Sequence, residues 1–306
     1  MSQPPTAPAR KPLPTNWRKW ILGARPRTLP AAIAPVLVGT AAAPRGVLSA
    51  WVFVCALGVA VFVQVATNYA NDYSDGKRGT DDPGARVGPP RLVGNGLATP
   101  SEVKRAMLIA FGLTALCGLP LVLFVDWKLV IVGIAAIAAG WFYTGGSRPY
   151  GYAGFGELFV FVFFGLVATV GSFYVQTLAI TWLAVVSGAA MGCLATALLV
   201  VNNLRDIPGD TEVGKRTLAV RLGDANTRWL YVALMVVPFL TLPVMAGVGE
   251  RPAAALAFVG LVMARRPVVA VLSGARGPQL IAVLGDTGRV QLVYGVLVAV
   301  GFLLGG

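Results

Sequence analysis

The chain has 306 residues, of which 56% are hydrophobic and 12% charged, and its net charge is +12. Soluble domains contain about 25% charged residues, so this composition excludes an ordinary soluble enzyme and indicates a membrane protein. The chain contains no histidine, which excludes any mechanism that depends on an imidazole base.

Residues 1–16 are rich in proline and polar side chains, and we expect a disordered cytoplasmic tail there, followed by a single domain over 17–306. Nine apolar stretches of that domain are long enough to cross about 30 Å of hydrocarbon. They are 29–44, 47–70, 104–125, 128–144, 155–176, 180–203, 228–248, 252–272 and 289–305. Because backbone groups inside a bilayer must be hydrogen-bonded internally, we predict an all-α integral membrane bundle of nine transmembrane helices.

The distribution of positive charge predicts the orientation. With the N-terminus in the cytoplasm, 22 of the 25 Lys and Arg residues lie on the cytoplasmic side, and only Arg45, Lys128 and Arg251 lie outside. This asymmetry follows the positive-inside rule and places the C-terminus outside. The charge therefore orients the protein and attracts anionic lipid or substrate, and we do not expect nucleic-acid binding.

Acidic residues gather in two clusters at the ends of the second and sixth stretches. The first cluster contains Asn68, Asn71, Asp72 and Asp75, and the second contains Asn202, Asn203, Asp206 and Asp210. Together with Asp81, Asp82 and Glu212, these segments hold seven of the 13 acidic residues. Because a carboxylate beside hydrocarbon is costly, such a concentration indicates a functional site on the cytoplasmic side.

The helical spacing of the first cluster aligns Asn68, Asp72 and Asp75 along one face. In the second cluster, we expect Pro208 and Gly209 to break the helix before Asp210. Carboxylates at helix C-termini are disfavoured by the helix dipole and by each other, and a bound divalent cation relieves both penalties. Oxygen ligands from Asp and Asn favour Mg²⁺; the alternative is a set of solvated helix ends.

Basic and aromatic residues accompany the clusters. Lys77 and Arg78 follow the first cluster, and Lys215 and Arg216 follow the second. Such residues either bind phosphate oxygens or only set the topology. The segment from Trp141 to Tyr152 joins two stretches on the same side, and its tyrosines either anchor the bilayer interface or place π-faces beside a developing cation. The isolated Arg148 within it favours a site.

Six segments together resemble the UbiA-type membrane prenyltransferases, and among these the branch that acts on 1,4-dihydroxy-2-naphthoate. They are 25–41, 71–82, 91–100, 143–165, 202–223 and 289–295. The resemblance implies a central cavity that opens laterally to lipid in a bacterial plasma membrane. It implies Mg²⁺-dependent transfer of a polyprenyl group from polyprenyl diphosphate to the naphthoate, with loss of CO₂ and diphosphate, in menaquinone biosynthesis. Arg78 departs from the pattern, in which Lys is expected.

The resemblance also implies roles for individual residues. Asp72 and Asp75, helped by Asn68 or Asn71, hold one Mg²⁺, Asp206 and Asp210 hold a second, and Tyr143 flanks the allylic carbon. The implied substrate-binding residues are Arg25, Asn68, Asn71, Lys77, Arg78, Arg148, Tyr150, Asn203 and Lys215. Arg25 is assigned to the carboxylate of the aromatic acceptor. No obligate protein partner is expected.

Two other functions fit parts of the pattern. One is prenylation of a different acceptor, such as 4-hydroxybenzoate, homogentisate or haem. The other is transport of a divalent cation through the same carboxylates. Transporters place their polar sites near the bilayer midplane, whereas these acids gather at one membrane face, so the enzyme hypothesis is preferred.

Overall fold

The computed structural model describes residues 16–79, 88 and 90–305. The predicted tail, apart from Asn16, and Asp81 and Asp82 lie outside these residues. The α-helices are α1 (Arg18–Ala24), α2 (Pro30–Ala42), α3 (Ala50–Arg78), α4 (Pro100–Phe124), α5 (Leu129–Phe142), α6 (Gly156–Val160), α7 (Ala168–Thr177), α8 (Trp182–Glu212), α9 (Leu218–Leu240), α10 (Leu242–Gly247), α11 (Gly260–Leu272) and α12 (Gln279–Gly305). Further helical turns are η1 (Pro26–Thr28), η2 (Arg45–Val47), the π-helix η3 (Phe161–Val167) and the 3₁₀-helix η4 (Pro252–Val259). The described part contains no strand.

Each predicted apolar stretch contains a helix, which confirms an all-α membrane bundle. Seven helical segments are long and apolar enough to span a bilayer: α3, α4, 156–177, α8, 218–247, 252–272 and α12. The other two stretches form α2 and α5, which have only 13 and 14 residues. The count of nine crossings therefore stays a prediction, because about 20 residues are normally needed to span the hydrocarbon.

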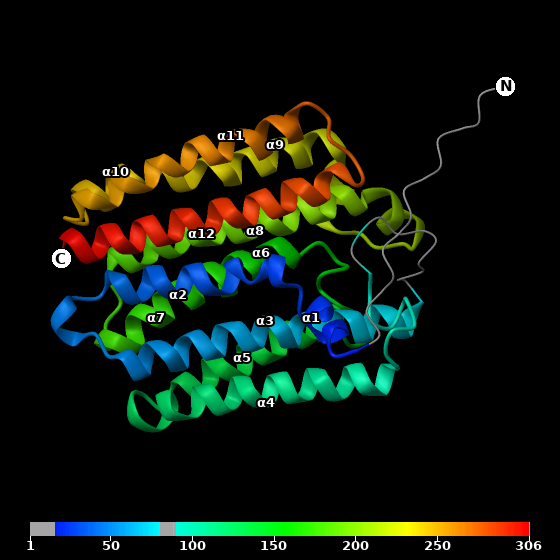
Figure 1. The fold of residues 1–306 in the computed structure, drawn as a ribbon, viewed down its shortest axis with the longest axis horizontal. Helices are drawn as coiled ribbons and strands as arrows, with labels where there is room; N and C mark the ends of the chain where they lie inside the picture. Colours follow the sequence, from blue (N-terminus) through cyan, green and yellow to red (C-terminus); the bar gives the residue numbers. More distant parts are fainter. Residues whose placement is uncertain (1–15, 80–87, 89, 306) are drawn as a thin grey trace.

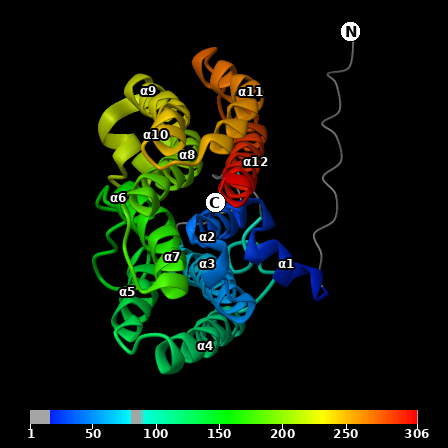
Figure 2. The ribbon, with the colours of Figure 1, turned by 90° about the vertical axis from the view of Figure 1, so that its left-hand side faces the viewer.

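The long helices lie side by side along the long axis of the molecule (Figure 1). The C-terminal ends of α3 and α8 and the connection between α11 and α12 all lie at the same end, on the right in Figure 1. Seen along this axis, the helices surround α2 (Figure 2). The two acidic clusters, far apart in sequence, are thus brought to one end of the bundle.

Small residues allow several helices at the centre of the bundle to approach closely. A Cβ atom added at Gly165 of η3 would lie 2.3 Å from the Cα atom of Gly192 in α8, and one added at Gly295 of α12 would lie 2.8 Å from the Cβ atom of Ala34 in α2. Close backbone approach at small residues is a common means of packing helices in lipid, where the hydrophobic effect does not drive their association. These contacts fix η3 against α8 and α12 against α2.

The acidic clusters lie within helices rather than beyond their ends. Helix α3 continues to Arg78 and is terminated by Gly79 in the left-handed conformation, with φ 71°, as is common at helix C-termini. The predicted break at Pro208 and Gly209 is wrong, because α8 runs through Pro208 to Glu212. Proline removes one donor of the helical ladder, and the bonding resumes at once, since the Val213 amide donates to the Gly209 carbonyl.

Candidate active site

A cavity of about 1140 Å³ extends through the bundle. Its wall is formed mainly by α2, α3, α4, α5, η3, α7 and α8, with further residues from α1, η1, α6 and the loop after α5, and with Ile281 and Leu284 of α12. Most of the lining side chains are apolar, but one end carries acids, amides and a lysine. We call this the polar end and define it by Asn71, Asp75, Asp206, Asp210 and Lys215, all of which line the cavity.

In the first cluster, the cavity face of α3 consists of Asn68, Asn71 and Asp75, spaced i, i+3 and i+7. Asp72 was predicted to share this face, but it is buried and is not among the lining residues; its Oδ2 atom accepts a hydrogen bond from the Leu92 amide at 3.2 Å. Helical spacing of three and of four both return to roughly one face, so the sequence did not distinguish Asn71 from Asp72. The metal-ligand role of Asp72 stays a prediction.

The amides of the first cluster are held by neighbouring segments. Asn71 Oδ1 accepts a hydrogen bond from Thr144 Oγ1 at 2.8 Å, and Asn68 Nδ2 donates to the carbonyl of Ala24 at 2.9 Å. The first contact ties α3 to the loop after α5, and the second ties it to α1. Both amides are therefore oriented before any substrate binds.

In the second cluster, all four predicted residues line the cavity. The buried Arg205 donates to both carboxylate oxygens of Asp206, at 2.7 Å each, and to Asn202 Oδ1 at 2.8 Å. Asn203 Nδ2 donates to Glu157 Oε1 at 2.9 Å. Such a two-point pairing fixes the carboxylate plane, while a carboxylate has about four acceptor positions in total and can take further ligands.

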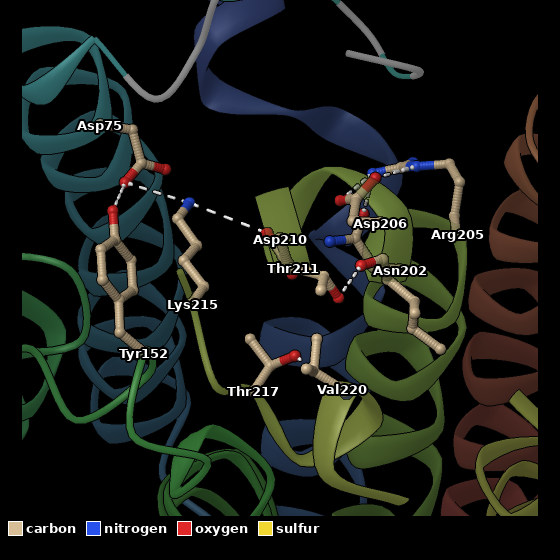
Figure 3. A network of polar contacts seen from close by, with 11 residues as sticks. Asp75, Tyr152, Asn202, Arg205, Asp206, Asp210, Thr211, Lys215, Thr217 and Val220 are labelled. Atoms are coloured by element: carbon tan, nitrogen blue, oxygen red, sulfur yellow. Dashed lines mark hydrogen bonds and ion pairs between the residues drawn. The ribbon is translucent and has the colours of Figure 1, made fainter. Parts of the chain in front are cut away.

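Lys215 joins the two clusters (Figure 3). Its Nζ atom lies 3.8 Å from Asp75 Oδ1 and 4.0 Å from Asp210 Oδ1. The hydroxyl of Tyr152 donates to the same oxygen of Asp75, and Lys215 Nζ lies 4.4 Å from the centroid of the Tyr152 ring. Two carboxylates from different helices, Asp75 of α3 and Asp210 of α8, therefore lie close enough to contact the same cation, here the ammonium group of Lys215.

Aromatic rings form the wall next to the polar end. Tyr143 and Tyr150 meet edge to face with centroids 5.5 Å apart, and Tyr150 stacks on Phe159 at 4.0 Å. The Tyr150 hydroxyl donates to the Ala139 carbonyl at 2.8 Å. Burial raises the pKa of Tyr150, so at neutral pH this group remains protonated and acts as a donor. The three rings line the cavity and place π-faces beside it.

Three predicted phosphate-binding residues do not line the cavity: Lys77, Arg78 and Arg148. Lys77 and Arg148 are exposed. Arg78 donates to the carbonyls of Thr144 and Gly146 and therefore holds the loop after α5. Their part in substrate binding stays a prediction.

The remaining basic residues of the cavity come from the segments that precede α2 and α4. Arg25 lines the cavity, as do Arg18, Arg27 and the buried Arg91. Arg25 has φ 53° at the junction of α1 and η1, a left-handed backbone that non-glycine residues seldom adopt. This kink joins α1 to η1, and arginines on both sides of it line the same cavity.

Sequence reasoning missed Arg205 and the contact of Tyr152 with Asp75. A signal for Arg205 was its position directly before Asp206, within the second cluster. Nothing in the spacing connects Tyr152 with Asp75, because the contact depends on how the loop after α5 folds over the end of α3.

Residues 32–273 match the UbiA prenyltransferase family. The chain belongs to this family. A Mycobacterium tuberculosis protein named 1,4-dihydroxy-2-naphthoate octaprenyltransferase is 51% identical, over 93% of this chain and 96% of its own length. An Escherichia coli protein of the same name is 42% identical, over 71% and 72% of the two chains.

The fold of this family member agrees with solved structures. A UbiA homologue from Archaeoglobus fulgidus, bound to GPP and Mg²⁺, superimposes with a TM-score of 0.60 and covers 92% of this chain and 99% of its own. Its sequence is 13% identical, so the likeness supports the fold alone. The all-helical architecture is therefore that of a UbiA-type bundle.

Proposed function

We propose that this protein transfers a polyprenyl group from polyprenyl diphosphate to 1,4-dihydroxy-2-naphthoate, releasing CO₂ and diphosphate, in menaquinone biosynthesis. The observation that carries the proposal is the convergence of Asp75, Asp210 and Lys215 at the polar end of an apolar cavity. The choice of acceptor is supported by the relatives that are 51% and 42% identical. We place the polar end at the cytoplasmic face of a bacterial plasma membrane, because the basic loops lie there.

The residues of the polar end fit Mg²⁺. Apart from Lys215, they offer hard oxygen donors, which this ion prefers, and few protein ligands are needed when substrate phosphates complete the coordination. No group of three acids or other metal-binding side chains forms among the described residues; at the polar end α3 supplies one acid and α8 supplies two. For one ion we propose Asp75 with Asn71, which lines the cavity in place of Asp72, and for a second ion Asp206 and Asp210. When bound, Mg²⁺ supplies neutralisation of the diphosphate charge.

The side chains that line the cavity have separate roles in the proposed reaction. Lys215 donates to the departing diphosphate, and Tyr143 and Tyr150 place their π-faces beside the allylic cation. The apolar wall excludes water, which would otherwise trap the cation. Arg25, with Arg27, binds the carboxylate of the acceptor.

The acceptor chemistry agrees with the residues present. The electron-rich ring attacks the allylic carbon through its carboxyl-bearing carbon, and loss of CO₂ returns the electron pair that restores aromaticity. The reaction therefore needs no base to remove a ring proton, in keeping with the absence of histidine.

We infer that the prenyl tail enters from the side of the bundle. Leu119 of α4 and Ile134 of α5 line the cavity and are also exposed on the surface, by 49% and 64%. A residue that meets both the cavity and the outside marks an opening between these helices. A tail that already lies in the bilayer can then reach the polar end without crossing water.

The acceptor is tested with membranes that contain the protein, Mg²⁺ and a radiolabelled polyprenyl diphosphate. With 1,4-dihydroxy-2-naphthoate we expect a prenylated naphthoquinol and one CO₂ released for each transfer. 4-Hydroxybenzoate and homogentisate should give no product. Product from 4-hydroxybenzoate alone would overturn the acceptor assignment while leaving the prenyltransferase assignment intact.

Replacing Tyr152 with Phe should raise the Mg²⁺ concentration needed for half-maximal activity. The change removes the donor to Asp75 and keeps the ring beside Lys215. Loss of a partner that orients a metal ligand reduces metal affinity or activity by about 10- to 100-fold, and we expect about tenfold here. The measurement is the rate of prenyl transfer as a function of Mg²⁺ concentration.

Tyr174→Phe is the matched control for Tyr152→Phe. Tyr174 also donates to a carboxylate, Asp126 Oδ2, at 2.5 Å, but it does not line the cavity. The Tyr174 hydroxyl, followed by the Lys128 amide, lowers the pKa of Asp126. The control should therefore change thermal stability and leave the Mg²⁺ dependence as in the unmodified protein. Equal Mg²⁺ dependence in both variants would contradict the role of Tyr152.

A further inference from the structure

We propose that α11 and α12 form, on the outer surface of the bundle, a binding site for the phosphate of an anionic membrane lipid. None of the residues that line this site also lines the reaction cavity, and the proposal does not depend on which acceptor is prenylated. It rests on a charged group of three residues, Arg266, Asp286 and Arg289, which we call the outer triad.

The outer triad carries a net positive charge. Arg266 Nε lies 3.5 Å from Asp286 Oδ2, and Arg289 Nη1 lies 2.9 Å from Asp286 Oδ1. The arginine side chains are 78% and 71% exposed, whereas that of Asp286 is 16% exposed. One carboxylate thus holds two guanidinium groups at the surface and balances only one of them. Arg265, the exposed neighbour of Arg266, adds to the excess.

The outer triad lies beside apolar surface that faces the lipid. Arg266 is six residues before the end of α11 at Leu272, and Asp286 is seven residues after the start of α12 at Gln279. At 1.5 Å per residue these positions are roughly 10 Å inside the helix ends. On α11, Val262 is 78% exposed and Val269 is 50% exposed. Charges beside such surface are costly unless a partner of opposite sign reaches them.

A hollow of about 340 Å³ lies beside the outer triad. Arg266, Asp286, Ser273 and Gln279 supply its polar lining, and the rest is apolar: Ala270, Ala275, Ala282 and Val283. Long basic side chains near helix ends extend toward the head-group level, and basic pockets between helices on the cytoplasmic side bind anionic head groups. The hollow therefore offers donors for a phosphate and apolar lining for the first part of the acyl chains. Free phosphate would use only the first of these.

Hydrogen bonds within the protein hold the connection between α11 and α12, which borders the hollow. The buried Arg228 of α9 is held by Asp224 at 2.6 Å and donates to the carbonyls of Val271 and Ala275, where α11 ends. The amide of Arg276 donates to Gln279 Oε1 at 3.2 Å, which holds the turn that precedes α12. The connection between α11 and α12 is thereby tied to α9, so the hollow is present before lipid binds.

The test compares thermal unfolding of the purified full-length protein in detergent with added phosphatidylglycerol, phosphatidylcholine or inorganic phosphate. Phosphatidylglycerol should raise Tm more than phosphatidylcholine does, and inorganic phosphate should not. In R266Q/R289Q this additional rise should be lost. The matched control is K104Q/R105Q, which removes two exposed charges from α4 at the same end of the bundle and should keep it.

Native mass spectrometry gives a second measurement on the folded fraction, in which R266Q/R289Q should retain fewer phosphatidylglycerol molecules than the control. If the double glutamine variant does not fold, R266K/R289K keeps the charges, and it should keep the response to phosphatidylglycerol. An equal Tm rise in R266Q/R289Q and in the unmodified protein would overturn the site. An equal rise with inorganic phosphate would overturn the lipid as its occupant.

Discussion

Replacing Asp75 with Asn should slow prenyl transfer by about 10³, because a lost metal ligand removes about 4 kcal/mol of transition-state stabilisation. The same replacement at Asp72 should slow it by less than about tenfold, since a residue that only supports the structure affects the rate indirectly. Asp75 lines the cavity and faces Lys215, whereas Asp72 accepts a hydrogen bond from the Leu92 amide. The measurement is kcat/KM for both substrates at saturating Mg²⁺.

The two variants also differ in stability. Asp72 is 1% exposed and holds the loop that contains Leu92, so its replacement should lower Tm. If the Asp72 variant were folded and as inactive as the Asp75 variant, Asp72 rather than Asn71 would be the metal ligand. The assignment of Asp72 from the sequence would then be correct, and the choice of Asn71 because it lines the cavity would be wrong.

The fold could be predicted largely because hydropathy is a local property. Each apolar stretch became a helix, and the acids at the ends of two stretches marked the polar end. The break expected at Pro208 is absent, because a single missing donor at an exposed position near the end of α8 is tolerated when the preceding part of the helix is buried. Helix α8 has the most buried membrane window, at 78%.

The site could be predicted only in part because charges do not reveal their partners. Lys215 and Arg78 both follow an acidic cluster in the sequence. Lys215 reaches two carboxylates of the cavity, while Arg78 bonds to the carbonyls of Thr144 and Gly146. The difference is set by the loop after α5, whose path depends on tertiary packing. The same holds for Arg205, because its pairing with the adjacent Asp206 depends on the direction in which each side chain points, which the sequence does not give.

Replacing Gly171 with Leu should shorten the prenyl chains that the enzyme accepts. Gly171 lines the cavity, and a Cβ atom added there has nothing within 4 Å, so a larger side chain projects into open space. It lies fifteen residues beyond Gly156 on the continuous helix 156–177, or roughly 22 Å along the helix at 1.5 Å per residue. The start of this helix lies beside the second cluster, because Glu157 accepts a hydrogen bond from Asn203. Only a long tail reaches this depth.

Transfer from long-chain donors should therefore fall about tenfold, because overfilling an apolar cavity costs about 1–3 kcal/mol. Transfer from geranyl diphosphate should be nearly unchanged. Gly112→Leu is the matched control, since Gly112 of α4 also has nothing within 4 Å but is exposed and does not line the cavity. A uniform loss with all donors in the Gly171 variant would indicate damage to the fold. Unchanged use of long donors would place the tail elsewhere, because a tail that passes Gly171 cannot share its space with a leucine side chain.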